Sequence, residues 1–209
     1  MKLNIFRHQL WHWSGLIIMS LYLLITSALV TSPAVTNENI LIALRLSSLT
    51  TAIAFWLVFA TKSIIKLNYQ AGSFLQENRR YLWLMATISH LIHLYQIFLY
   101  YQLGNSCPLM VWLITSPLWI LMTLFAVVEI FQPQLLDGII SPDKSNESNK
   151  YWNFFYRFSL WYIWLVFTIA FSLGTIAKQL IFYNLPASIL YLAAAIIPIV
   201  FWCQQKVKA

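Results

Sequence analysis

The sequence predicts an all-α polytopic membrane protein, a bundle of six transmembrane helices with both termini on the cytoplasmic side. The chain of 209 residues is 60% hydrophobic and only 9% charged, whereas soluble domains carry about 25% charged residues. Its apolar residues form six stretches, each near the roughly 20 residues that a helix needs to cross a bilayer. Because lipid offers the backbone no hydrogen-bond partners, each stretch must be helical.

These stretches form a single membrane domain that covers residues 1–209. We expect the spans at 11–30, 40–61, 81–101, 109–131, 155–177 and 185–202. They leave no room for a separate nucleotide-binding domain, and the glycine-rich signatures of such domains are absent from the sequence. A soluble redox cofactor would therefore have to arrive with a partner protein.

The distribution of basic residues predicts the orientation. They occur in the amino terminus, the second and fourth loops and the tail: Lys2, Arg7, Lys62, Lys66, Arg79, Arg80, Lys144, Lys150, Lys206 and Lys208. The other loops hold Lys178 alone. Since positive residues mark the cytoplasmic side, both termini are expected there. We attribute the net charge of +7 to this topology, and we expect no nucleic-acid partner.

Two histidines in the third span are the main candidates for chemistry. His90 and His93 are three residues apart, which places both imidazoles on one helical face. Ionisable groups deep in a membrane helix usually face the bundle interior and serve a function, so the pair is a candidate metal site. Haem is the natural ligand for them, because imidazole is a standard axial ligand. The alternative is that the rings only hydrogen-bond to neighbouring helices.

A bis-histidine haem would need a second histidine from another span, because two residues on one helix face cannot approach the iron from both sides. His12 is the only other histidine inside a predicted span, and it is a third candidate for cofactor binding. It lies near the cytoplasmic end of its span, far shallower than His93. His8 and His12 form an i, i+4 pair that is either a metal pair or an interfacial anchor.

Two charged residues near the cytoplasmic ends of the fourth and fifth spans are expected to pair. Glu129 lies close to the end of the fourth span, and Arg157 opens the fifth. A salt bridge between them would lower the cost of placing both charges in the membrane. The functional alternative for Glu129 is a proton path.

The order of these features resembles the ferric reductase-like transmembrane family. His12-Trp-Ser-Gly-Leu16 is similar to the opening of that family's first span, and Arg45 stands where the family has an arginine entering the second. Arg79-Arg80 followed by His93 resembles the family's basic pair and third-span haem histidine. Within the family, the chain is similar to the haem-binding membrane subunits of bacterial methionine-sulfoxide reductase systems. The resemblance covers the whole chain.

The resemblance implies a b-type cytochrome of the bacterial inner membrane that carries electrons between partner proteins, with haem b as its cofactor. One departure stands out. The family's fifth span supplies histidines opposite the third, whereas the matching positions here hold Tyr156 and Ile169. Tyrosine is an axial ligand in some haem proteins.

Two functions therefore remain open at this stage. In the first, the protein is the ferric reductase-like electron-transfer subunit of an oxidoreductase, with His93 the leading haem ligand and His90 the second. In the other, it is a haem-free relative that serves as a membrane anchor or assembly subunit and contacts partner helices through aromatic faces. A small transporter is a weaker third possibility, because no pair of interrupted spans occurs in corresponding halves of the chain.

Overall fold

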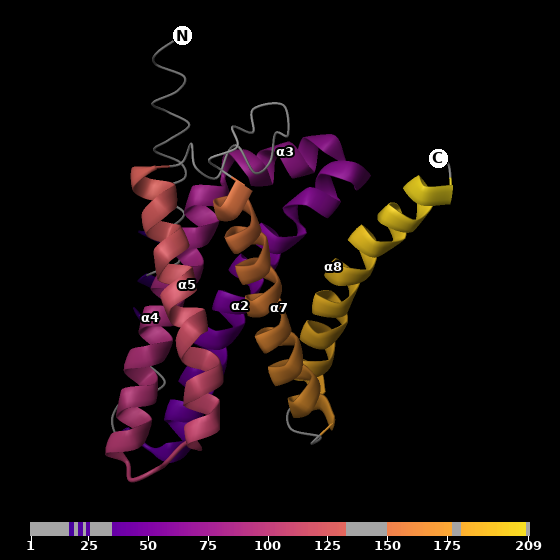
Figure 1. The fold of residues 1–209 in the computed structure, drawn as a ribbon. Helices are drawn as coiled ribbons and strands as arrows, with labels where there is room; N and C mark the ends of the chain where they lie inside the picture. The colour runs from indigo at the N-terminus through magenta and orange to yellow at the C-terminus, as the bar shows by residue number, and fades with distance from the viewer. Residues whose placement is uncertain are drawn as a thin grey trace. The chain divides into compact units, whose positions relative to one another are not determined.

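The chain is all-helical in the part that the structure describes, which confirms the all-α part of the predicted fold class there (Figure 1). This computed structural model describes residues 17–18, 21–22, 24–25, 35–132, 150–176 and 181–207. The helices with described bounds are α2 (Asn37–Leu67), α3 (Tyr69–Glu77), α4 (Arg79–Gln102), α5 (Leu109–Phe131), α7 (Lys150–Ile176) and α8 (Ile181–Val207).

Four of the described helices, α2, α4, α5 and α7, are long and apolar enough to cross a membrane. The first three contain the spans predicted at 40–61, 81–101 and 109–131, and α5 begins and ends where its span is predicted to. Helix α7 starts at Lys150, five residues before the start of the span predicted at 155–177. These helices indicate an integral membrane protein in contact with lipid.

The remaining two predicted spans stay predictions. The span expected at 185–202 lies within α8, whose described apolar stretch, Asn184–Ile197, is shorter than a membrane span. Most of the span expected at 11–30 lies outside the described residues, although the six of its residues that are described are helical.

The surface of α5 has the polarity expected of a lipid-facing helix. Leu113 and Ile120, seven residues apart, leave 59% and 68% of their surface exposed. On the opposite face the carboxylate residue Glu129 is only 2% exposed and lies among buried apolar residues. An apolar outside with a charged residue turned inward is the arrangement that a hydrocarbon solvent favours.

The described chain divides into two compact units, which we treat separately. Unit 1 spans residues 1–55 and 78–131, and unit 2 spans 56–77 and 132–209, so α2 contributes to both. In unit 1, α4 and α5 pack side by side. Their core is aromatic: the Trp83 ring lies 6.1 Å from Phe55 and 5.3 Å from Phe125, measured between ring centroids, and all three side chains are fully buried.

Unit 2 contains the last part of α2, α3, and the pair α7 and α8, which pack along each other. Two tryptophan side chains, one on α7 and one on α2, donate hydrogen bonds to α8. Trp164 of α7 donates from Nε1 to the carbonyl oxygen of Tyr191 over 2.7 Å, and Trp56 of α2 donates to the carbonyl of Leu190 over 2.9 Å. Such bonds satisfy the indole N–H groups inside an apolar environment.

Short polar and glycine residues mark the helix boundaries. Thr36 accepts a hydrogen bond from the backbone N–H of Asn39 at the start of α2, and the Asn68 side chain accepts one from Ala71 at the start of α3, both in the manner of helix N-caps. After α4, Gly104 has a φ of 81° and donates its N–H to Tyr101. This left-handed conformation, which glycine adopts without strain, ends the helix.

Candidate functional site

The α4 helix carries His90 and His93 on one face in unit 1, as their spacing predicts. The two ring centroids lie 5.7 Å apart, and the ring planes are inclined by 21°, so the rings are nearly stacked. Two stacked rings on one helix do not approach a single iron from opposite sides. The pair therefore supplies at most one axial bond to a haem.

The ring of His93 is held by α2 through its Nδ1 atom, which lies 3.1 Å from the carbonyl oxygen of Leu44. Because a carbonyl oxygen only accepts, Nδ1 carries the proton and donates it to Leu44. The Ser47 hydroxyl lies 2.9 Å from the same nitrogen and donates to Oε1 of Gln96 over 2.6 Å. This network assigns Nε2 as the ring nitrogen with an available electron pair.

His93 lines a cavity of about 200 Å³ in unit 1. The other lining residues come from α2, α4, α5 and the α4–α5 turn and are mostly apolar or aromatic: Leu44, Ile97, Tyr100, Tyr101, Cys107, Val111, Trp112, Thr115 and Trp119. Ligand pockets commonly measure about 300–1,000 Å³. The cavity therefore has room for part of a haem and not for the whole macrocycle.

His90 lies deeper in the helix pair, with 9% of its surface exposed. Its ring meets Trp119 of α5 edge-on, at 5.5 Å between centroids and an angle of 69°. Neither ring nitrogen has a hydrogen-bond partner among the described residues. A buried polar group of this kind costs stability unless a ligand or a water satisfies it, so a group bound at the His90 ring would add stability.

A set of small polar side chains sets the position of α4 against α2. Thr51 donates to the Ser89 hydroxyl over 3.0 Å, and Ser89 donates to the carbonyl oxygen of Ser47 over 2.8 Å. Ser47 and Thr51 are four residues apart, as are Ser89 and His93, so each helix presents its polar groups as one stripe. Sequence reasoning missed Ser47, which contacts His93, and the three residues that bond to Ser47: Thr51, Ser89 and Gln96. Their periodic placement within apolar spans was the available signal.

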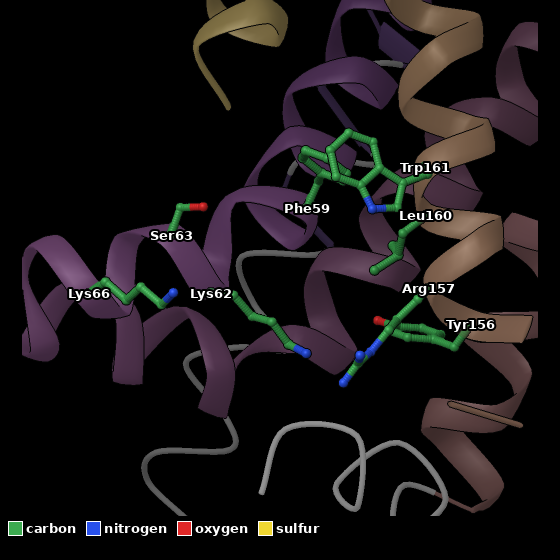
Figure 2. Close-up of a pocket in the computed structure, with 8 residues that line it drawn as sticks. All are labelled: Phe59, Lys62, Ser63, Lys66, Tyr156, Arg157, Leu160 and Trp161. Atoms are coloured by element: carbon green, nitrogen blue, oxygen red, sulfur yellow. The ribbon is translucent and has the colours of Figure 1, made fainter. Parts of the chain in front are cut away.

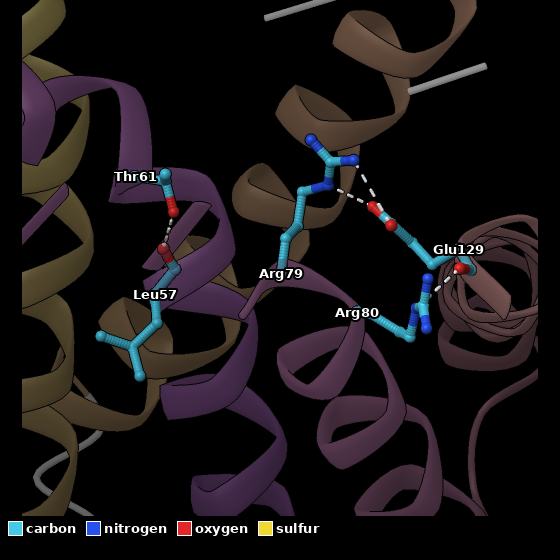
Figure 3. Close-up of polar contacts among 5 residues, drawn as sticks. All are labelled: Leu57, Thr61, Arg79, Arg80 and Glu129. Atoms are coloured by element: carbon cyan, nitrogen blue, oxygen red, sulfur yellow. Dashed lines mark hydrogen bonds and ion pairs between the residues drawn. The ribbon is translucent and has the colours of Figure 1, made fainter. Parts of the chain in front are cut away.

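Glu129 forms an ion pair with Arg79 of α4, a partner that the sequence did not indicate (Figure 3). The pair predicted between Glu129 and Arg157 joins residues of different units and stays a prediction. The Arg79 Nε and Nη2 atoms both donate to the carboxylate, the second over 3.3 Å, and the two side chains are 6% and 3% exposed. Arg80 adds a bond of 3.1 Å from its Nε to the backbone oxygen of Glu129. Helix α5 packs beside α4, which places the carboxylate next to the first turn of α4.

The described residues contain no cluster of three or more His, Cys, Asp or Glu side chains that could hold a metal ion. His90 and His93 therefore remain candidates for a single bond to a metal or haem iron. His12, the third candidate, lies outside the described residues. Comparisons of the chain with models of protein families, with curated proteins and with solved structures found no match. Any functional conclusion must rest on the site itself.

Proposed function

We propose that this chain is a ferric reductase-like membrane subunit of a redox complex, and that His93 binds haem b through Nε2. One observation carries the proposal. The Nδ1–H of His93 is engaged by the carbonyl oxygen of Leu44 at 3.1 Å, so the nitrogen left for a metal is Nε2. Histidines that bind metals almost always donate their other ring N–H to a carbonyl or carboxylate group, which fixes the tautomer and the ring orientation.

Among the described residues, His93 is available as a single axial ligand, as in globins and peroxidases, and a haem bound there would have to extend beyond the cavity of about 200 Å³. The described residues do not supply the second histidine of the bis-histidine haem implied by the family resemblance, and His12 lies outside them. His90 and His93 share one face, and the described helix α7 contains no histidine. A bound haem would supply reversible one-electron transfer. The protein's own contribution is to orient the imidazole through Leu44 and Ser47 and to keep water away with Trp112 and Trp119.

An absorption experiment tests the proposal. The protein is purified from haem-replete cells, and its reduced-minus-oxidised spectrum is recorded. We expect a b-type band that is lost in His93→Gly and restored when free imidazole is added, because imidazole can occupy the space left by the side chain. Thr50→Ala, which removes a hydroxyl bonded only within its own helix, should keep the band. A band of full intensity in His93→Gly without imidazole would refute the role of His93.

A second candidate function is a haem-free anchor or assembly subunit in a larger membrane complex. The exposed aromatic face of α7 favours it. Tyr151, Phe154 and Phe158 recur at helical spacing with 86%, 71% and 61% of their surface exposed, and the last two rings are stacked at 6.4 Å. Aromatic residues are enriched at the centres of protein interfaces. A colourless but cooperatively folding preparation, obtained from haem-replete cells, would favour this function over electron transfer.

A further inference from the structure

The short helix α3 joins two long apolar helices with almost no intervening chain. Only Asn68 separates it from the end of α2, and only Asn78 separates it from the start of α4. Its nine residues extend about 13 Å at 1.5 Å per residue. Both α2 and α4 are long and apolar enough to cross a membrane. Each end of α3 is therefore tied to the level at which a span leaves the hydrocarbon.

The chain reverses direction between α2 and α3. Along one continuous helix, residues seven positions apart are separated by about 10 Å. Gly72 instead packs so closely on Ile65 that an added Cβ atom would clash with the Ile65 backbone. Figure 1 shows α3 turning away from the axis of α2 at their junction. This reversal directs α3 back toward the membrane surface and not outward into the aqueous phase.

The residues of α3 divide into an apolar arc and a polar arc. At about 100° per residue, the apolar arc comprises Gly72, Ala71, Phe74 and Leu75. The opposite arc contains polar residues and one tyrosine: Tyr69, Gln70, Ser73, Gln76 and Glu77. Gly72, at one edge of the apolar arc, is buried, whereas Ala71 is exposed and Phe74 leaves 54% of its surface exposed. Packing on α2 thus covers one edge of the apolar arc and leaves the rest accessible.

The accessible part of the apolar arc lies outside the cavity of unit 2. That cavity measures about 330 Å³ and lies between the last turns of α2 and the early part of α7 (Figure 2). The described residues that line it all belong to those two helices. Leu67, the last residue of α2, is 62% exposed at the junction with α3. The apolar surface of the α2 span therefore continues along the chain into α3.

We infer that α3 is an interfacial helix whose apolar arc inserts among the lipid head groups while its polar arc faces water. Helices with this division of polarity lie in the membrane plane, with the apolar face about 5–10 Å deep at the boundary between head groups and acyl chains. Phe74 provides the largest apolar side chain of the arc. A lipid surface fits both the arc and its attachment to two spans. The inference does not depend on whether haem binds at His93.

Site-directed spin labelling of the full-length protein tests this orientation. The protein is reconstituted in vesicles of phosphatidylcholine and phosphatidylglycerol, with both native cysteines removed by Cys107→Ser and Cys203→Ser. Nitroxide labels are then attached to single introduced cysteines, two on each arc: Ala71→Cys, Phe74→Cys, Gln70→Cys and Glu77→Cys. Collisions with molecular oxygen report exposure to hydrocarbon, and collisions with a water-soluble nickel chelate report exposure to water.

We expect the ratio of oxygen to nickel collisions to shift toward oxygen at Ala71→Cys and Phe74→Cys and toward nickel at Gln70→Cys and Glu77→Cys. All four native residues are exposed, so the labels should leave the fold intact. Adjacent Gln70 and Ala71 form a matched pair that differs only in direction around the helix. Equal ratios at the four sites would overturn the inference. So would few collisions with either reagent at Phe74→Cys, because a protein partner and not lipid would then cover the apolar arc.

Discussion

The Nδ1 atom of His93 and the hydroxyl oxygen of Ser47 lie 2.9 Å apart, joining two helices at positions 46 residues apart in the sequence. Hydrogen bonds between membrane helices contribute about 0.6 kcal/mol on average and at most about 1.7. Because Ser47 also bonds to Gln96, we expect Ser47→Ala to lower the free energy of unfolding by roughly 1 kcal/mol, measured by denaturation in mixed detergent micelles.

Thr50→Ala is the control for that measurement. The Thr50 hydroxyl bonds only to the carbonyl of Leu46 in its own helix, so its loss should leave the α2–α4 contact intact. Similar unfolding energies for the two variants would mean that the Ser47 bond does not hold these helices together.

The unpartnered ring of His90 predicts an unusual response to mutation. An unsatisfied buried polar group costs about 1–3 kcal/mol, and His90→Phe removes both nitrogens while keeping an aromatic ring beside Trp119. In protein without a bound ligand, this variant should unfold at the same temperature as the wild type or higher. His93→Phe, which breaks the bond to Leu44, should unfold at a lower temperature. A large drop for His90→Phe would show that its nitrogens are satisfied.

The buried ion pair between Arg79 and Glu129 predicts asymmetric effects of single and double changes. Glu129→Gln leaves the Arg79 charge buried without its counter-ion, which should cost about 3–5 kcal/mol. Replacing both residues, as in Arg79→Met with Glu129→Leu, should recover most of that loss, since no charge stays buried. The free energies of unfolding of the three proteins test this, with exposed Glu38→Gln as the control. A double variant less stable than Glu129→Gln would contradict it.

Gly72 in α3 allows a close approach to α2. A Cβ atom built on Gly72 would clash with the backbone N and Cα atoms of Ile65. Backbone atoms cannot move aside as the end of a flexible side chain can. Gly72→Ala should therefore displace α3 from α2 at a cost of about 1–3 kcal/mol. Hydrogen exchange of residues 69–77 is the measurement, and we expect it to accelerate. Ser73→Ala adds no atom at the next position, and its exchange should match the wild type.

The sequence predicted the apolar helices well because their lengths follow from the bilayer's thickness. The span at 109–131 coincides with α5 because Gly104 and Pro108 interrupt the helical pattern before it. Helix α3 was missed. Its nine residues are short and mixed in polarity, and the Asn68 side chain that caps it was the only local signal.

The candidate site was predictable only in part. The shared face of His90 and His93 follows from helical periodicity alone. Their partners depend on how α2 is rotated and placed against α4, which spacing along one helix does not encode, so Ser47 was missed. Arg79 was missed as a partner of Glu129 for the same reason, because the packing of α4 beside α5 brings the two side chains together.

The separation of Arg79 and Glu129 by 50 positions has a consequence for biogenesis. A ribosome completes α4 well before it polymerises Glu129, so the arginine emerges while its counter-ion does not yet exist. Helix α4 should therefore remain at the translocon, or in the headgroup layer, until α5 has been synthesised. The two helices would then enter the bilayer as one neutralised hairpin during translation.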